Sequence, residues 1–264
     1  MSVPRFYVEP LSGPVVNLSE AEARHARQSR RLSAGDPVAI FDGRGRQASG
    51  RIAACTPRQV SIAVESVAQV PRPLPQLALA FTPPKGPRQD TLIEKCTELG
   101  VAVLQPIETA RSVAEASSHR LDKWQRTAIE AAKQAGLAWL PEIHERLALE
   151  KLLAQLPAYD VALIAVSPGD EKGVRSLLCK APFGPSRQKA SDPFSVAIQD
   201  LLPQLRDARS VLALVGPEGG WADEEIAQAI AAGARPISLG PNILRIETTA
   251  IALAASMHAL QSYL

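Results

Sequence analysis

Two turns rich in glycine and proline carry the residue types in this chain that are best suited to binding a small molecule. The first is Gly216-Pro-Glu-Gly-Gly220, which follows an apolar run, and the second is Leu239-Gly-Pro-Asn-Ile-Leu-Arg245, which precedes a helical pattern. Turns that follow parallel strands present free backbone amides at the carboxyl edge of a sheet, where open α/β sheets bind their ligands. We therefore expect both turns to form one pocket.

The first turn lacks the residues that would bind a phosphate. It matches neither the GxxxxGK[ST] pattern of a P-loop nor the GxGxxG pattern of a dinucleotide site. Acidic residues at 223–225 stabilise the next helix through its dipole and also discourage an anion there. The turn thus favours an adenosine or a cationic ligand over a triphosphate, although an ordinary strand-to-helix turn explains the five residues equally well.

The second turn combines one cation with apolar side chains that could hold a flat ring, namely Leu239, Ile243 and Leu244. Arg245 could bond the anionic part of a substrate. It could equally pair with a nearby carboxylate, either Glu247 or Glu218. The residues of this turn leave both interpretations open.

The composition excludes several kinds of site. Three cysteines and four histidines are scattered without CxxC or HExxH spacing, so we expect reduced thiols and no metal. The start of the chain lacks the apolar core of a signal peptide, and no apolar run reaches transmembrane length. We therefore expect a cytoplasmic protein with no membrane partner.

The charge of the chain is unevenly placed. Residues 1–72 hold ten arginines, no lysine and six acidic residues, whereas the formal net charge of the whole chain is only +2. A basic front attached to a near-neutral body indicates a polyanionic partner for the front.

The first 72 residues are predicted to form a small β-barrel with one helix. Strands are expected at residues 5–8, 37–41, 48–53 and 59–67. The helix is expected from residue 18 to residue 32, because Ser19 and Glu22 have the spacing of a capping box. Pro71, Pro73 and Pro75 then stiffen a linker, which indicates a domain boundary after residue 72.

Strands and helices alternate beyond the linker. Strands are expected at residues 76–81, 102–107, 161–166, 211–215 and 236–239, and helices at residues 88–99, 119–135, 223–232 and 247–264. This alternation predicts an α/β domain whose mostly parallel sheet carries helices on both faces. Residues 167–193 are rich in proline and are expected to form a long loop, either a lid or a plain insertion.

Two groups of basic residues are of the kind that contacts phosphates. In the front helix, Arg24, Arg27 and Arg31 share one face, which favours a nucleic-acid backbone over a solvated helix face. Lys85 and Arg88 lie between a strand and a helix, where they either meet phosphate or remain solvated. Aromatic residues that could stack on bases are few near the helix: Phe6, Tyr7 and Phe41.

Taken together, these motifs resemble the ribosomal RNA small-subunit methyltransferase E family of the SPOUT superfamily. The resemblance spans nearly the whole chain and is carried by residues 25–32, 85–86, 94–100, 130–136, 216–220 and 239–250. The last two segments, in this order and spacing, are highly specific. The sequence departs from the family pattern at Asn242 and Leu137, where arginine is usual, and at Ile246, where threonine is common.

The resemblance implies an S-adenosylmethionine-dependent enzyme that methylates N3 of a uridine in 16S ribosomal RNA of the small ribosomal subunit. It implies a PUA-like barrel over residues 1–72 and a methyltransferase domain over residues 73–264. The carboxyl-terminal part of that domain would form a trefoil knot, which is an exception to usual chain topology. It also implies a homodimer built partly on the last helix.

The same resemblance assigns residues to binding. S-adenosylmethionine would be held by Leu214, Gly216, Pro217, Glu218, Gly219, Gly220, Leu239, Gly240, Ile243, Leu244 and Thr249. RNA would be held by Arg5, Arg24, Arg27, Arg31, Lys85 and Arg88.

The proton on uridine N3 sets the chemical problem, because the sulfonium is already a reactive methyl donor. We expect Arg245 to stabilise negative charge on the uracil carbonyls while Glu218 or water accepts the proton. Two alternatives remain. One is a non-catalytic RNA-binding module with a degenerate methyltransferase domain that dimerises, and Asn242 and Leu137 would be its marks. The other is a phosphotransferase, which the missing P-loop lysine disfavours.

Overall fold

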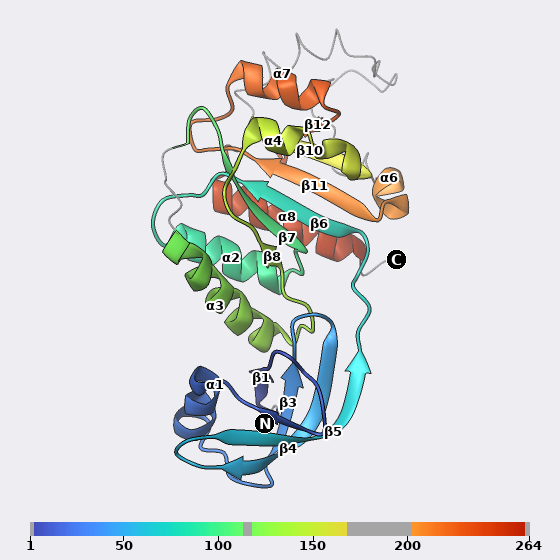
Figure 1. Cartoon of the computed structure of the whole chain (residues 1–264). Helices are drawn as coiled ribbons and strands as arrows, with labels where there is room; N and C mark the ends of the chain where they lie inside the picture. The colour runs from blue at the N-terminus through green and yellow to red at the C-terminus, as the bar shows by residue number, and fades with distance from the viewer. Residues whose placement is uncertain (1–2, 113–117, 168–201, 262–264) are drawn as a thin grey trace. The chain divides into compact units, whose positions relative to one another are not determined.

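The computed structural model describes residues 3–112, 118–167 and 202–261. The chain forms two compact units, which are coloured by residue number in Figure 1. The first unit contains the chain up to Arg72 together with Ala128–Leu140, and the second contains Pro73–Thr127 and the chain from Pro141 onward.

The first unit is built on a five-stranded sheet. In spatial order its strands are β1 (Arg5–Tyr7), β3 (Pro37–Phe41), β4 (Arg46–Cys55), β5 (Val60–Gln69) and β2 (Val15–Asn17). Only β1 and β3 pair in parallel, and the other neighbours are antiparallel. The sheet curls around one apolar core (Figure 1), because alternate residues of each strand are buried in it.

The helix of the first unit is shorter than the sequence predicts. Helix α1 spans Glu20–Arg24, and the Glu22 amide donates to the Ser19 hydroxyl at 3.3 Å, as the capping box requires. A π-helical turn, η1 (His25–Ser29), follows directly. The predicted helix therefore ends at residue 29 instead of residue 32, and its last turn is wider than an α-helical turn.

Arg31 has the backbone conformation that glycine usually supplies at the end of a helix. Its φ is +54°, and the Leu32 amide beyond it donates back to the Ala26 carbonyl at 3.1 Å. A side chain in this left-handed region is unfavourable by roughly 1–2 kcal/mol. The chain thus keeps an arginine where its backbone would be more stable with glycine.

Residues Ala128–Leu140 follow the linker in sequence, yet they pack within the first unit. The segment begins inside helix α3 (Ser118–Ala135). Lys133 Nζ lies 2.9 Å from a carboxylate oxygen of Glu22, and both side chains are buried. No local pattern signals this contact, because 111 residues separate the two partners.

The second unit contains a parallel sheet. Its strands, in spatial order, are β12 (Arg235–Ile237), β10 (Val161–Ala165), β11 (Ser210–Val215), β6 (Gln76–Phe81), β7 (Val103–Glu108) and β8 (Glu142–Ile143), and β9 (Leu147–Ala148) also pairs with β7. Every pairing is parallel. The carboxyl ends of β12, β10 and β11 therefore lie side by side at one edge.

Helices cover both faces of this sheet (Figure 1). One face carries α2 (Arg88–Glu98) and α8 (Ile246–Gln261), and the other carries α4 (Leu149–Leu153) and α7 (Asp223–Ala231). A short 3-10 helix (Leu156–Ala158) and α6 (Leu202–Asp207) complete the described elements. Because both faces are buried, the central strands β10, β11 and β6 are apolar except for Ser210 and Gln76 at their amino ends.

The α/β class predicted from the alternation is confirmed, and each predicted strand is present within two residues of its expected ends. The sequence analysis missed the very short elements, among them β2, β8 and β9, because two or three residues show no periodicity. The predicted loop at 167–193 lies, apart from Ser167, outside the described residues. Across the described ranges, no helix is both long and apolar enough to span a bilayer.

Candidate active site

A pocket opens where the neighbouring strands β12, β10 and β11 end. Its walls are drawn from residues 165–167 after β10, residues 215–221 after β11, and residues 239–249 after β12. The empty volume is about 590 Å³, open mouth included. The two predicted turns do form one pocket at the carboxyl edge of the sheet.

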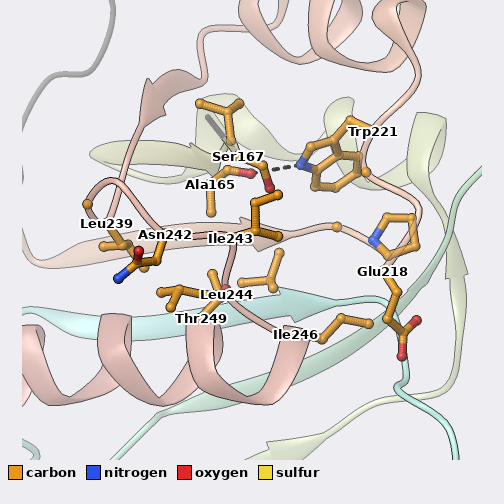
Figure 2. A pocket seen from close by; sticks show the side chains of 16 residues that line it. Ala165, Ser167, Glu218, Trp221, Leu239, Asn242, Ile243, Leu244, Ile246 and Thr249 are labelled. Carbon is orange, nitrogen blue, oxygen red and sulfur yellow. Dashed lines mark hydrogen bonds between the residues drawn. The ribbon is translucent and has the colours of Figure 1, made fainter. Parts of the chain in front are cut away.

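The first turn is folded tightly around a tryptophan. The Gly220 amide donates to the Pro217 carbonyl at 2.9 Å, and Gly220 takes a φ of +72°. Trp221 is buried, and its indole nitrogen donates to the Ala165 carbonyl of β10 at 2.8 Å (Figure 2). A Cβ on Gly216 would lie 2.6 Å from this indole. Glycine is therefore required at residue 216 for the turn to close against Trp221.

The second turn contributes an open, apolar wall. Ile243 is 77% exposed although it lines the pocket. Figure 2 shows Ile243 between Leu239 and Asn242 on one side and Trp221 on the other. Gly240 has a φ of +118°, which a side chain would not tolerate. The pocket thus offers an uncovered apolar side chain beside the backbone of two turns, a combination that suits a flat, partly polar ring.

Most residues predicted to bind the small molecule do line this pocket. They are Gly216, Pro217, Glu218, Gly220, Leu239, Gly240, Ile243, Leu244 and Thr249. The other two lie outside it: Leu214 is fully buried inside β11, and Gly219 is exposed on the turn without lining the pocket. The sequence analysis missed the wall formed by residues 165–167 at the end of β10. The strand itself was predicted, and the residue that follows its predicted end is Ser167.

The two side chains predicted to take part in chemistry differ in their surroundings. Glu218 lines the pocket, and its carboxylate lies 3.6 Å from the guanidinium of Arg88 at the start of α2. Arg245 is exposed and does not line the pocket. Within the described ranges, its side chain pairs with neither Glu218 nor Glu247, so neither expected ion pair is present. Its charge remains available to a ligand.

Local partners engage several of the arginines predicted to bind RNA. Arg5 donates to the Leu137 carbonyl at 2.6 Å, and its guanidinium lies 4.7 Å from the centre of the Phe41 ring. Arg24 pairs with Glu20 at 2.9 Å. The pair of Arg24 with Glu20 shows that the predicted basic face of the front helix already carries a carboxylate.

Other basic groups of the first unit remain exposed. Arg27 donates to the Thr56 carbonyl at 3.2 Å, which brings the π-helical turn next to the β4–β5 loop that carries Arg58. Arg30, Arg31 and Arg58 are all exposed. Burial, together with the nearby charge of Lys133, lowers the pKa of His25, which is therefore neutral at pH 7. Among the described residues, the exposed positive charge near this turn therefore comes from arginines, since Lys133 is buried.

Each aromatic ring in the described part of the first unit is engaged by the protein itself. Phe6 and Phe41 are fully buried. Tyr7 packs against Phe41 and donates its hydroxyl to Glu9. Trp139 donates to the Val70 carbonyl at 3.0 Å and is covered by the guanidinium of Arg72. The described part of the first unit therefore offers charge to a nucleic acid, and each of its rings already has a partner within the protein.

Comparison with protein families defines the class of protein. Residues 71–258, which include the parallel sheet and the pocket, match the family described as RNA methyltransferase domain. Residues 18–65 match the RNA methyltransferase PUA domain. Across the described residues, no group of histidines, cysteines and carboxylates has the geometry of a metal site. The fold and the site are those of an RNA methyltransferase with a PUA domain.

Relatives narrow this class. The chain is 32% identical over 255 residues to the ribosomal RNA small subunit methyltransferase E of Synechocystis sp., with 96% of this chain and 75% of the relative covered. It is 26% identical to the Bacillus subtilis protein of the same name, with 89% and 86% covered. The chain belongs to the ribosomal RNA small subunit methyltransferase E family, as its motifs predicted.

Solved structures agree with this assignment. A ribosomal RNA small subunit methyltransferase E from Neisseria gonorrhoeae, bound to S-adenosyl methionine, matches with a TM-score of 0.79 at 25% identity. A methyltransferase from Legionella pneumophila in complex with the cofactor SAM also matches with a TM-score of 0.79, at 26% identity. Each match covers 98% of both chains. The likeness thus includes both the sheet with its pocket and the front unit.

Proposed function

We propose that this protein uses S-adenosylmethionine to methylate N3 of a uridine in 16S ribosomal RNA of the small ribosomal subunit. The observation that carries the proposal is the open pocket that the two turns form at the carboxyl edge of the sheet. Two solved relatives bind S-adenosylmethionine, and curated relatives are named for the small-subunit ribosomal RNA.

The pocket fits S-adenosylmethionine better than it fits a nucleotide phosphate. Leu239, Ile243 and Leu244 would hold the adenine ring, and the backbone of residues 216–220 would hold its polar edge and ribose. Lysine is absent from the lining, and Glu218 supplies a negative charge that suits a sulfonium cation. When bound, the cofactor supplies an electrophilic methyl group.

The chain's own side chains would then accept the proton of the acceptor base and stabilise the negative charge that its loss leaves. Uridine N3 carries a proton that must leave, and Glu218 or a water accepts it. Arg245, which is exposed and free of a carboxylate partner among the described residues, stabilises the negative charge on the uracil carbonyl oxygens. Arg88, held 3.6 Å from Glu218, orients that carboxylate. The base must leave any stack, because N3 lies on its pairing edge.

The first unit would bind the RNA backbone. Its exposed arginines suit phosphates, and the engagement of every ring described in it speaks against base stacking. Arg27 and Arg31 would contact phosphates as the sequence suggested. Arg30 and Arg58 would join them, because the Arg27–Thr56 contact brings their segments together. Lys85 would add a contact from the second unit.

The remaining features of the family extend the proposal. Residues 1–72 would form the PUA-like RNA-binding domain and residues 73–264 the methyltransferase domain, with a trefoil knot at its carboxyl-terminal end. The protein would act in the cytoplasm as a homodimer. Ala254, Met257 and Leu260 of α8 are buried within the protomer, so a dimer would use the other side of this helix, where Ile251 is half-exposed.

A thermal-shift assay with S-adenosylhomocysteine and with ATP tests the cofactor. Stabilisation by S-adenosylhomocysteine alone supports the proposal. Stabilisation by ATP alone indicates a phosphotransferase, and stabilisation by neither favours an RNA-binding module without catalysis. Mass mapping of modified nucleosides in cells lacking the protein then tests the target, because loss of a 3-methyluridine from 16S ribosomal RNA is expected. An unchanged nucleoside map would contradict the assigned substrate.

A further inference from the structure

A loop that follows β7 lies against the first turn of the pocket. Arg111 in this loop donates from one guanidinium nitrogen to two turn carbonyls, that of Gly219 at 2.8 Å and that of Trp221 at 3.1 Å. The aliphatic stem of Arg111 also lies close to Gly219, since a Cβ there would be 3.5 Å from the arginine Cδ. Arg111 does not stand out by sequence pattern.

A buried carboxylate joins the same two segments by accepting hydrogen bonds, whereas Arg111 donates them. Glu225 of α7 is 8% exposed. One of its oxygens accepts from the Ala110 amide at 2.7 Å, and the other accepts from the Ala222 amide at 2.9 Å. The loop is itself braced, because the Thr109 amide donates to the Ser112 hydroxyl at 2.8 Å. Arg111 and Glu225 thus connect the loop and the turn by four hydrogen bonds, all to charged groups.

These contacts fix two peptide groups of the turn, one directly after Trp221 and one two residues before it. The peptide between Trp221 and Ala222 gives its carbonyl to Arg111 and its N–H to Glu225. The peptide between Gly219 and Gly220 gives its carbonyl to Arg111 and its N–H to the Pro217 carbonyl. With both ends of each peptide group held, neither can flip, and the indole that lines the pocket stays in place.

Such a device is needed because this turn is intrinsically loose. Three of its residues are glycines, which lose more conformational freedom on ordering than any other residue. A ligand that had to order the turn on binding would lose affinity, whereas a turn ordered in advance would not. Hydrogen bonds to charged groups are the stronger kind for this purpose.

We propose that Arg111 and Glu225 are positioning residues that hold the turn at residues 216–221 ready for S-adenosylmethionine. The proposal rests on the function proposed above. Arg111 acts through the turn backbone and touches neither the acceptor base nor the RNA.

Calorimetry with S-adenosylhomocysteine tests it in the full-length protein. Arg111→Met keeps the aliphatic stem and removes the donors, and we expect its Kd to rise about tenfold. Arg111→Lys keeps a charged donor and should recover part of that loss. The matched control is Arg126→Met, in the part of α3 that belongs to the second unit. Arg126 is exposed and, within the described ranges, makes no ion pair. The Arg126→Met protein should therefore bind S-adenosylhomocysteine with the Kd of the wild type.

Steady-state kinetics supplies the second measurement. For Arg111→Met we expect the KM for S-adenosylmethionine to rise about tenfold while the KM for the RNA substrate stays within twofold of wild type. A wild-type Kd in Arg111→Met overturns the inference, as does a rise in the RNA KM instead, which would make Arg111 an RNA contact. If the wild-type protein itself fails to bind S-adenosylhomocysteine, the proposed function fails, and that outcome is distinct from both.

Discussion

The pocket of the second unit and the basic end of the first unit are built on different principles. The pocket is shaped by backbone: glycines at 216, 220 and 240 permit its turns, and a buried tryptophan sets their spacing. The basic end depends on side-chain charge, and part of that charge is already used, since Arg24 pairs with Glu20.

The difference shows which kind of site a sequence reports faithfully. A glycine needed for a positive φ or a close approach is needed whatever lies elsewhere in the chain. Whether an arginine is free depends on partners that distant segments bring to it, as with Arg5 and the Leu137 carbonyl. Backbone sites are therefore easier to infer than charged surfaces.

The largest expected effect is at Arg245, which stabilises the developing negative charge in the proposed chemistry. Arg245→Ala should lower kcat by about 10²–10³-fold, as loss of a donor to a developing negative charge does. Affinity for S-adenosylhomocysteine and for RNA should stay near wild type, and Arg245→Lys should be intermediate. Single-turnover methylation assays measure the effect. Undiminished turnover in Arg245→Ala would remove this residue from catalysis.

The buried pair in the first unit tests how strongly a distant partner governs a charge. Lys133→Met leaves the Glu22 carboxylate buried without its cation and should destabilise the protein by about 3 kcal/mol at pH 7, measured by urea unfolding. The control Lys123→Met breaks an exposed pair with Asp90 and should change stability by less than about 1 kcal/mol. Equal losses in the two variants would contradict the assigned difference in burial.

The same variant predicts a pH dependence with a defined sign. Burial raises the pKa of Glu22, and Lys133 lowers it again. Without Lys133 the folded-state pKa rises further, so above pH 4.5 the folded protein retains a proton that the unfolded chain has lost. The stability of Lys133→Met therefore falls as pH rises through this window. Its deficit against wild type should be smallest below pH 4.5 and largest near pH 7.

Gly216→Ala tests the backbone side of the comparison. Its Cβ would lie 2.6 Å from the Trp221 indole, so we expect a loss of about 2 kcal/mol in stability and weaker binding of S-adenosylhomocysteine by calorimetry. Gly219→Ala is the matched control, because its Cβ meets only ordinary contacts at 3.5 Å and its φ is not positive. If both variants bind alike, the pocket does not depend on the fit between Gly216 and Trp221.

The smallest expected effect is at Arg31, and it gives the most specific test of the charged surface. Arg31→Gly relieves a left-handed arginine, so Tm should rise by about 2 °C. The same change removes a phosphate contact, so the salt dependence of binding to a 16S ribosomal RNA fragment should fall by about one unit in slope.

Two further arginine variants serve as controls. Arg27→Ala should lower the slope similarly without raising Tm. Arg24→Ala should change the slope less, because Glu20 already neutralises that charge. A rise in Tm with an unchanged slope would mean that Arg31 contacts no RNA.

Much of the fold could be predicted because apolar runs, glycine stops and proline turns act locally. The strands β6 and β3 have the predicted ends, and the two turns meet as expected. The bonds from Arg111 to Gly219 and from Ala110 to Glu225 could not be found in this way, since their partners lie 108 and 115 residues apart. The π-helical turn at His25–Ser29 was missed because its apolar spacing matches an ordinary helix.

The inclusion of residues 128–140 in the first unit affects how this protein can be made and cut. A fragment ending at the proline linker would expose the surface that Lys133 and Trp139 cover and leave Glu22 unneutralised. During translation, the amino-terminal unit cannot be completed until residue 140 has left the ribosomal exit tunnel, after a stretch of the second unit has already emerged. The residues that are synthesised first must therefore wait for a segment beyond β7 before their own unit can fold completely.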